Sequence, residues 1–136
     1  MYIKMTKNKD IMLTLNQFPV VQYDIIFKET LEEMSKFNLG IACLVDKENN
    51  LKGVITDGDI RRKILNIQKP FSAFFVDDAI VHAVKEPICS NPETNINETL
   101  KIMNTNQIWD LPVINNKKLV GLVHLHPALN KLINKI

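Results

Sequence analysis

The chain has few of the residues that mark specialised protein classes. Its 136 residues include only two cysteines, Cys43 and Cys89, which lack C-x-x-C spacing and lie among apolar neighbours. We therefore expect two reduced, buried thiols in a cytoplasmic protein, and no disulfide framework. No apolar run approaches the roughly 20 residues of a membrane-spanning helix, and the polar opening MYIKMTKNKD has no signal-peptide pattern.

The chain also lacks an excess of charge. A net charge of +2 without any run of Lys or Arg gives no electrostatic signature of a nucleic-acid-binding protein. Apolar residues make up 46% and charged residues 24%, which is typical of a globular protein. The length fits one compact domain or two very small ones.

An internal repeat is the main feature that the sequence does have. KETLEEM at 28–34 and NETLKIM at 97–103 share the pattern Glu-Thr-Leu-x-x-Met, 69 residues apart. LKGVI at 51–55 matches LVGLV at 119–123, 68 residues apart. The difference of one residue falls in a polar turn, DKENN against NNKK, where a repeat tolerates an insertion.

Both copies predict the order β-α-β-β-α, an α/β (α+β) fold. An extended piece next to a proline precedes an amphipathic helix, then two strands joined by a polar turn, then a second amphipathic helix. In copy one these segments are FPVVQ and residues 26–37, 40–46, 51–57 and 58–67. In copy two they are PICSNP and residues 96–106, 110–115, 119–125 and 127–136. We divide the chain into a lead-in at 1–9, copy one at 10–70, and a connector with copy two at 71–136. Neither copy is expected to be stable alone.

The segment Gly53-Val54-Ile55-Thr56-Asp57-Gly58-Asp59 at the end of copy one resembles the signature of the CBS domain pair, or Bateman module, a tandem repeat with pseudo-twofold symmetry. LEEMSKFNLGIACLVD, TDGDIRR and GLVHLHPAL resemble more closely the regulatory CBS pair at the C-terminus of the arabinose 5-phosphate isomerase family. That family feeds the synthesis of Kdo for bacterial lipopolysaccharide. CBS pairs of sugar nucleotidyltransferases also carry TDGDIRR.

Thr56 is expected where a strand ends and a helix begins, and the free N–H groups of such a helix start favour an anion. Gly58 would let a ligand approach the backbone, Asp59 would accept hydrogen bonds from a ribose diol, and Arg62 or Arg61 would reach a phosphate. The alternative is that Thr56 or Asp57 only caps the helix and Asp59 complements its dipole. Asp57 and Asp59 are not expected to be a general acid–base pair, because their side chains point apart.

The resemblance implies that this motif works with the opening segment and middle strand of the other copy. The candidate walls for a base are then Ile88, Cys89, Trp109, Leu111 and Pro112. Copy two has His124 in the place of Thr56 and Pro127 in the place of Asp59, so a second site of the same kind is doubtful. His124 faces a ligand or is structural. On a strand His124 and His126 would share a face and could bind a metal, but no third ligand lies nearby in sequence, so no metal site is expected unless Asp110 supplies one in space.

We predict a regulatory, non-catalytic module without a permanent cofactor. It would sense AMP, ADP, ATP or a sugar nucleotide such as CMP-Kdo, control a sugar isomerase in cis or in trans, and form a homodimer through its helices. The alternatives are the regulatory CBS pair of a sugar nucleotidyltransferase and a structural dimerisation module with an empty cleft.

Overall fold

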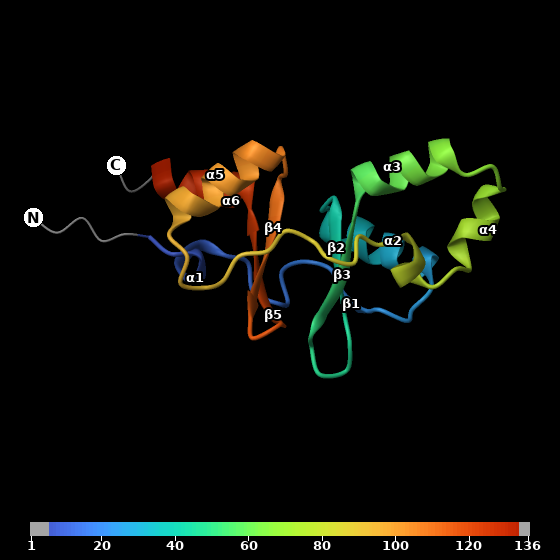
Figure 1. Cartoon of the computed structure of the whole chain (residues 1–136), viewed down its shortest axis with the longest axis horizontal. Helices are drawn as coiled ribbons and strands as arrows, with labels where there is room; N and C mark the ends of the chain where they lie inside the picture. The colour runs from blue at the N-terminus through green and yellow to red at the C-terminus, as the bar shows by residue number, and fades with distance from the viewer. Residues whose placement is uncertain (1–5, 134–136) are drawn as a thin grey trace, which may run out of the picture. The chain divides into compact units, whose positions relative to one another are not determined.

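The structure, a computed structural model, describes residues 6–133 apart from the side chain of Leu132 (Figure 1). Residues 1–5 of the expected lead-in and 134–136 of the expected last helix lie outside the described residues. The chain folds as two compact units, which we name after the copies. The described part of the copy-one unit is residues 16–87, and that of the copy-two unit is residues 6–15 together with 88–133.

The copy-one unit has the predicted order of elements. A three-stranded sheet has the order β1-β2-β3, with β1 parallel and β3 antiparallel to β2. Its elements are β1 (Val20–Gln22), α2 (Phe27–Phe37), β2 (Ile41–Val45), β3 (Leu51–Thr56), α3 (Asp57–Asn66), α4 (Phe71–Phe75) and a 3₁₀ helix η1 (Ala79–His82). The predicted α/β class is therefore confirmed, and the connector adds two short helices that the sequence analysis did not predict.

The copy-two unit repeats this plan with a reduced opening strand. Its elements are α1 (Asn8–Ile11), α5 (Ile96–Asn106), β4 (Asp110–Asn115), β5 (Lys118–His124) and α6 (Leu125–Ile133). Where copy one pairs Val21 with Leu44, copy two keeps a single parallel bridge from Ser90 to Val113. The predicted extended piece PICSNP thus forms no strand, because the flanking prolines Pro87 and Pro92 have no N–H to extend the ladder.

Backbone details at equivalent positions support the repeat. Helices α2 and α5 both end in a left-handed residue, Asn38 and Gln107, each with φ of 54°. The insertion lies where it was predicted. In copy two the strands are joined by a tight turn with φ of 50° and 69° at Asn116 and Lys117, whereas copy one has a longer turn around Asp46.

Each unit contains the segment that precedes the other copy in the sequence. The segment before copy two packs in the copy-one unit, and the segment before copy one packs in the copy-two unit. In the copy-one unit the Phe27 N–H donates to Asp77 O at 2.8 Å, and in the copy-two unit the Ile96 N–H donates to Thr6 O at 2.8 Å. The bridges follow the same rule: Ile26 with Asp78 and Val54 with Val84 match Lys7 with Asn95 and Leu13 with Leu122. Residues 6–13 and 77–84 are therefore equivalent segments, which we call the lead segments. This differs from the division into 1–9, 10–70 and 71–136.

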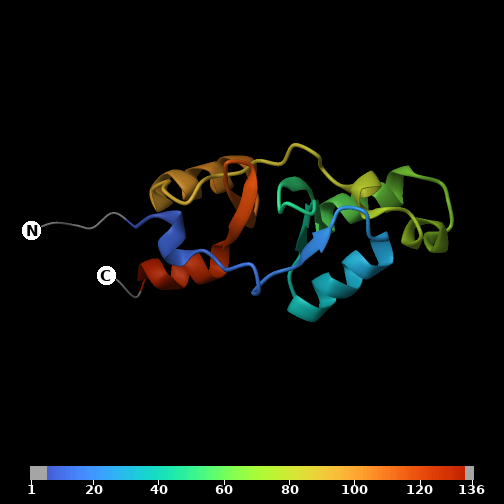
Figure 2. The same cartoon turned by 90° about the horizontal axis from the view of Figure 1, so that it is seen from below.

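The lead segment 6–13 is held by buried contacts. Figure 2 shows α1 beside α6, where Lys131 Nζ donates to Asp10 O at 3.2 Å. Asn8 is fully buried. Its side-chain nitrogen donates to Ser90 Oγ at 3.0 Å and to Asn91 O at 2.9 Å. Its side-chain oxygen accepts from Thr99 Oγ1 at 2.7 Å. Residues 6–9 of the expected lead-in thus belong to the folded copy-two unit.

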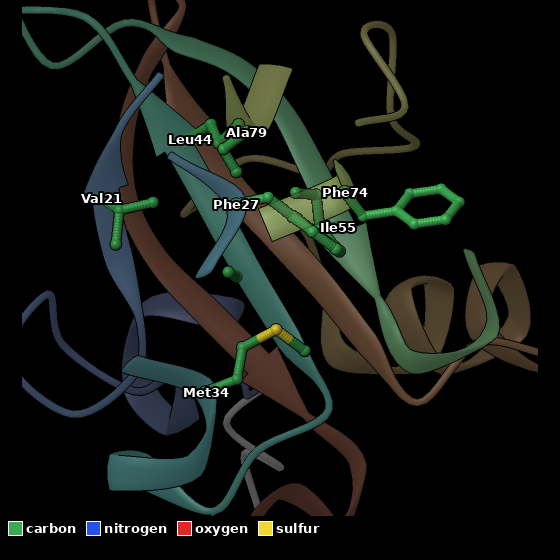
Figure 3. Packing of buried hydrophobic residues seen from close by; sticks show 8 residues of the cluster. Val21, Phe27, Met34, Leu44, Ile55, Phe74 and Ala79 are labelled. Atoms are coloured by element: carbon green, nitrogen blue, oxygen red, sulfur yellow. The ribbon is translucent and has the colours of Figure 1, made fainter. Parts of the chain in front are cut away.

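Each unit has its own apolar core. The copy-one cluster joins all three strands with α2, α4 and η1 and includes Ala42. Figure 3 shows its other members, Val21, Phe27, Met34, Leu44, Ile55, Phe74 and Ala79. The copy-two cluster contains Ile11, Ile96, Met103, Leu111, Val113, Val123 and Ala128. Ile11 comes from the lead segment, so the copy-two core is complete only with residues from the start of the chain.

Candidate functional site

The predicted junction in copy one is present: β3 ends at Thr56 and α3 begins at Asp57. Thr56 has an extended backbone and caps the helix, accepting from the Asp59 N–H at Oγ1 over 3.2 Å. Asp59 Oδ2 in turn accepts from the Thr56 N–H at 3.1 Å and from Thr56 Oγ1 at 2.9 Å. The two residues thus form a reciprocal capping box, which satisfies donors that a helix start otherwise leaves free.

Arg62, in the second turn of α3, forms an ion pair with Asp59 of this capping box. Its Nη2 lies 2.8 Å from Asp59 Oδ1, and the Arg62 side chain is 58% exposed while that of Asp59 is 15% exposed. A Cβ on Gly58 would lie 3.2 Å from Arg62 Nη1, so the missing side chain leaves room for the guanidinium. Arg62 is therefore an exposed charged group at this junction, and the less exposed Asp59 lies behind it.

Asp57 faces the other side of the helix start. Its N–H donates to Gly40 O at 3.0 Å, and its carboxylate lies so close to Gly40 that a Cβ there would come within 2.6 Å of Oδ2. The structure thus brings together Thr56, Asp59 and Arg62, whereas Asp57 packs against the start of β2.

The equivalent junction in copy two is built from different residues. The Leu125 N–H donates to Trp109 O at 2.9 Å, as the Asp57 N–H does to Gly40 O. His124, the last residue of β5, faces Asp110 across the sheet, and its Nδ1 lies 2.6 Å from Asp110 Oδ1. The carboxylate at the junction thus belongs to Asp59 on helix α3 in copy one and to Asp110 on strand β4 in copy two. The sequence analysis named Asp110 only as a possible third metal ligand close to the histidines in space, although the register of the predicted hairpin places it directly opposite His124.

The candidate wall residues differ in how accessible they are. Trp109 is 69% exposed and Ile88 is 43% exposed, so both have side-chain surface for a ligand. Cys89 is half-buried, and burial raises the pKa of its thiol to about 11, so at neutral pH it is a protonated thiol and a poor nucleophile. Leu111 lies fully buried in the copy-two core and Pro112 is also buried, which leaves three of the five with surface to offer.

The remaining histidines do not gather into a metal centre. The strand ends at His124, so His126 lies on helix α6 and the two imidazoles do not share a strand face. Within residues 6–133 there is no group of three or more His, Cys, Asp or Glu side chains placed to hold a metal ion.

His82 is a buried histidine at the end of the lead segment 77–84. Its Nε2 lies 2.8 Å from Asp77 Oδ2, and its ring packs between Phe27 and Phe74 with centroid distances of 4.9 and 5.5 Å. Hydrogen bonds from Lys69 and His82 hold the pKa of Asp77 below its usual range. His82 occupies the place of Ile11 in copy two, so we assign it to the core.

The family model described as "CBS domain" matches residues 9–66 and 76–126 of this chain. The chain belongs to the CBS domain family. Its two matched segments make it a CBS pair, which confirms the predicted tandem repeat. None of the helices within residues 6–133 is long and apolar enough to span a membrane.

Similar proteins show how this CBS pair compares with longer chains. It is 33% identical over 126 residues to the uncharacterized protein RP505 of Rickettsia prowazekii, covering 93% of this chain and 38% of that one. It is 28% identical over 121 residues to the arabinose 5-phosphate isomerase KdsD of Yersinia pestis, covering 88% of this chain and 35% of KdsD. The chain thus spans little more than a third of these relatives.

Solved structures of CBS proteins share the fold at low identity. CBSX2 in complex with AMP has a TM-score of 0.82 at 18% identity, covering 95% of this chain and 97% of CBSX2. The CBS domain pair of MJ0100, in complex with 5′-methylthioadenosine and S-adenosyl-L-methionine, has a TM-score of 0.77 at 19% identity, covering 98% of this chain and 100% of that one.

Proposed function

We propose that this CBS pair is a regulatory module that binds an adenine nucleotide or a sugar nucleotide at the start of α3. The observation that carries the proposal is the group formed by Thr56, Asp59 and Arg62. There a carboxylate lies behind an exposed guanidinium at a helix N-terminus, where a phosphate and a neighbouring diol find complementary partners. CBSX2 bound to AMP and MJ0100 bound to two adenosine derivatives support this class of ligand.

In this proposal Arg62 turns from Asp59 to the ligand phosphate. Arg62 is on the surface, and an exposed ion pair contributes only about 0–1 kcal/mol, so a phosphate can replace Asp59 as its partner at small cost. Asp59 Oδ1 then becomes free to accept from ribose hydroxyls, while Oδ2 keeps its bonds to Thr56. Gly58 and Asp57 are the proposed neighbours of the phosphate, and Ile88, Cys89 and Trp109 of the copy-two unit are kept as separate candidate contacts for a base.

A screen of melting temperatures tests the function. We expect AMP, ADP, ATP or CMP-Kdo to raise the melting temperature. A ligand that binds only the folded state raises the free energy of unfolding by about 2.7 kcal/mol when its concentration is 100 times its Kd. Adenine and ribose 5-phosphate serve as fragment controls. Unchanged melting temperatures with all four nucleotides, together with flat calorimetric titrations, would favour the alternative of a structural dimerisation module.

We further propose that ligand occupancy controls a sugar-phosphate isomerase of the Kdo pathway in the cytoplasm, with this CBS pair carrying no catalytic group itself. The support is the match to KdsD over 88% of this chain. Regulation requires that the ligand bind more tightly in one conformational state than in the other. The runner-up partner is a sugar nucleotidyltransferase, and activity assays of both enzymes with and without CMP-Kdo distinguish the two.

We also propose that two copies of the chain associate through helices of the copy-one unit. Leu65 on α3, Phe71 on α4 and the adjoining Val76 are 74%, 61% and 70% exposed, which is more apolar surface than single scattered residues explain. Light scattering at micromolar concentration is expected to give the mass of two chains, and Leu65→Glu is expected to reduce it to one. Lys63→Glu on the same helix is the matched control, and a wild-type mass of one chain would contradict the proposal.

A further inference from the structure

The two lead segments carry different buried side chains at equivalent positions. The Asn8 N–H donates to Thr94 O at 2.9 Å, and the Ala79 N–H donates to Ile25 O at 2.7 Å. Each acceptor lies two residues before the first helix of its copy, so Asn8 and Ala79 are equivalent. Both are fully buried. An amide in one segment thus occupies the place of a methyl group in the other.

The residues that receive these two side chains differ in the same sense. The Asn8 side chain donates to Ser90 Oγ at 3.0 Å, and Ser90 forms the parallel bridge to Val113. In copy one that place in the ladder belongs to Val21, which pairs with Leu44 and is part of the apolar cluster. An amide at this point of the copy-one unit would therefore meet an isopropyl group, where the copy-two unit has a hydroxyl.

Two equivalent buried threonines follow the same division. Thr99 is the fourth residue of α5, and its Oγ1 donates to Asn8 Oδ1 at 2.7 Å. Thr30 is the fourth residue of α2, and its Oγ1 lies 3.4 Å from Ile26 O at the start of its own helix. The hydroxyl in copy one thus has an acceptor without any contribution from the lead segment.

A second difference lies three residues further along each segment. His82 is 4% exposed and the equivalent Ile11 is 3% exposed. The His82 ring packs against Phe27, and its Nε2 lies 2.8 Å from Asp77 Oδ2. Copy two has Ile96 as the first residue of α5, where Phe27 is the first residue of α2. An imidazole in the place of Ile11 would lie beside an aliphatic side chain.

The backbone alone does not distinguish the two segments. A Cβ on Gly53 would lie 2.9 Å from Val84 O, and a Cβ on Gly121 would lie 2.9 Å from Leu13 O, so both units leave the same clearance for a passing chain. Both segments also form the same antiparallel bridges. As far as the main chain is concerned, either segment could therefore pack in either unit.

We propose that Asn8 and His82 determine which lead segment each unit accepts. Asn8 in the copy-one unit would bury an amide beside Val21 without the hydroxyl of Ser90, and a buried polar group without a partner is costly. Buried polar residues can select one pairing among several that share a backbone geometry. The competitor that is excluded is the other lead segment, from the same chain or from a second copy. The inference does not depend on nucleotide binding.

The test exchanges residues between the copies in the full chain and follows the amide signals of each unit during urea denaturation. Ala79→Asn is expected to lower the urea midpoint of the copy-one signals by about 1 M, because it buries an amide without a partner. Val21→Ser supplies the hydroxyl. In the double variant we expect a loss smaller than the sum of the single losses by at least about 0.5 M. Val81→Asp, which introduces the equivalent Asp10 at a position that is 56% exposed, is the matched control and is expected to leave the midpoint unchanged.

Recovery by the second substitution is also informative if the first variant does not fold. If Ala79→Asn unfolds the copy-one unit, the return of its amide signals on addition of Val21→Ser supports the inference, and their absence overturns it. Additive losses in the two single variants also overturn it, as does an Ala79→Asn chain that is as stable as wild type. In each of these contrary cases the copy-one unit would not distinguish the amide of one segment from the methyl group of the other.

Discussion

A chain lacking residues 1–13 is expected to lose the folded structure of the copy-two unit. The deletion removes Ile11 from the copy-two core and the Leu13 backbone from its bridge with Leu122. Burial of an isoleucine contributes about 1.5–3 kcal/mol, and small domains are stable by only about 5–15 kcal/mol in total. Amide spectra are expected to lose the dispersed signals of α5, β4, β5 and α6.

The deletion has a second cost in buried polar groups. Without Asn8 the hydroxyl of the fully buried Thr99 loses the oxygen to which it donates, and an unsatisfied buried group costs about 1–3 kcal/mol. Asn8→Ala is therefore expected to be an intermediate case, folded but less stable by about 2–4 kcal/mol in urea denaturation. Lys9→Gln next to it, which removes only a surface ion pair with Glu93, is expected to leave the urea midpoint nearly unchanged.

A peptide of residues 1–13 distinguishes lost contacts from a general folding defect. Added in excess to the deleted chain, it is expected to restore the copy-two amide signals, because the same hydrogen bonds to Thr94, Pro92 and Leu122 can form between two molecules. Dispersed copy-two signals in the deleted chain without the peptide would show that the lead segment 6–13 is not needed.

The sequence predicted the parts of this fold that depend on local pattern. Helical spacing of Phe27, Leu31 and Met34 located α2, and alternation of polar and apolar runs located both hairpins. Comparison of the copies placed the one-residue insertion in the turn. These features follow from residues close together in the sequence, so one chain is enough to find them.

The exchange of the lead segments could not be predicted in this way. Residues 6–9 belong to a polar opening that suggests a lead-in outside the fold, and their burial depends on partners more than 80 residues away, such as Asn8 with Ser90. The pairing of His124 with Asp110 is an intermediate case, since the two residues are 14 apart and the register of the predicted hairpin sets them opposite each other. Long-range pairing is set by packing of whole elements, which local periodicity does not encode.

For the motif of copy one, the sequence predicted the position correctly but did not decide between two roles. Both hypotheses for Thr56 and Asp59, helix capping and ligand binding, use the same atoms, and the structure shows that the capping contacts are formed. Capping alone does not explain the exposed Arg62 held at Asp59 Oδ1. A test must therefore separate the contribution of Asp59 to the helix start from its contribution to a ligand.

Asp59→Asn is expected to weaken AMP binding at least tenfold while lowering the unfolding free energy by only about 1 kcal/mol. Asparagine keeps the size of the side chain and an oxygen that can accept from the Thr56 N–H, so much of the capping box survives. It loses the charge that strengthens hydrogen bonds from a ribose diol, where each bond to a charged group contributes about 1.5–3 kcal/mol and 1.4 kcal/mol is a factor of ten. Calorimetry with AMP and urea denaturation measure the two effects separately.

Two further variants make the test of the α3 junction specific. Thr56→Ser keeps the hydroxyl of the capping box and is expected to bind AMP within about twofold of wild type, since a change of about 0.4 kcal/mol or less is expected for a retained bond. Arg62→Gln leaves Asp59 and the box in place and removes the proposed phosphate contact, so it is expected to weaken AMP and leave any adenosine binding at this junction unaffected. If Asp59→Asn binds AMP as wild type does, Asp59 only caps the helix, and the ligand contact must be sought outside this junction.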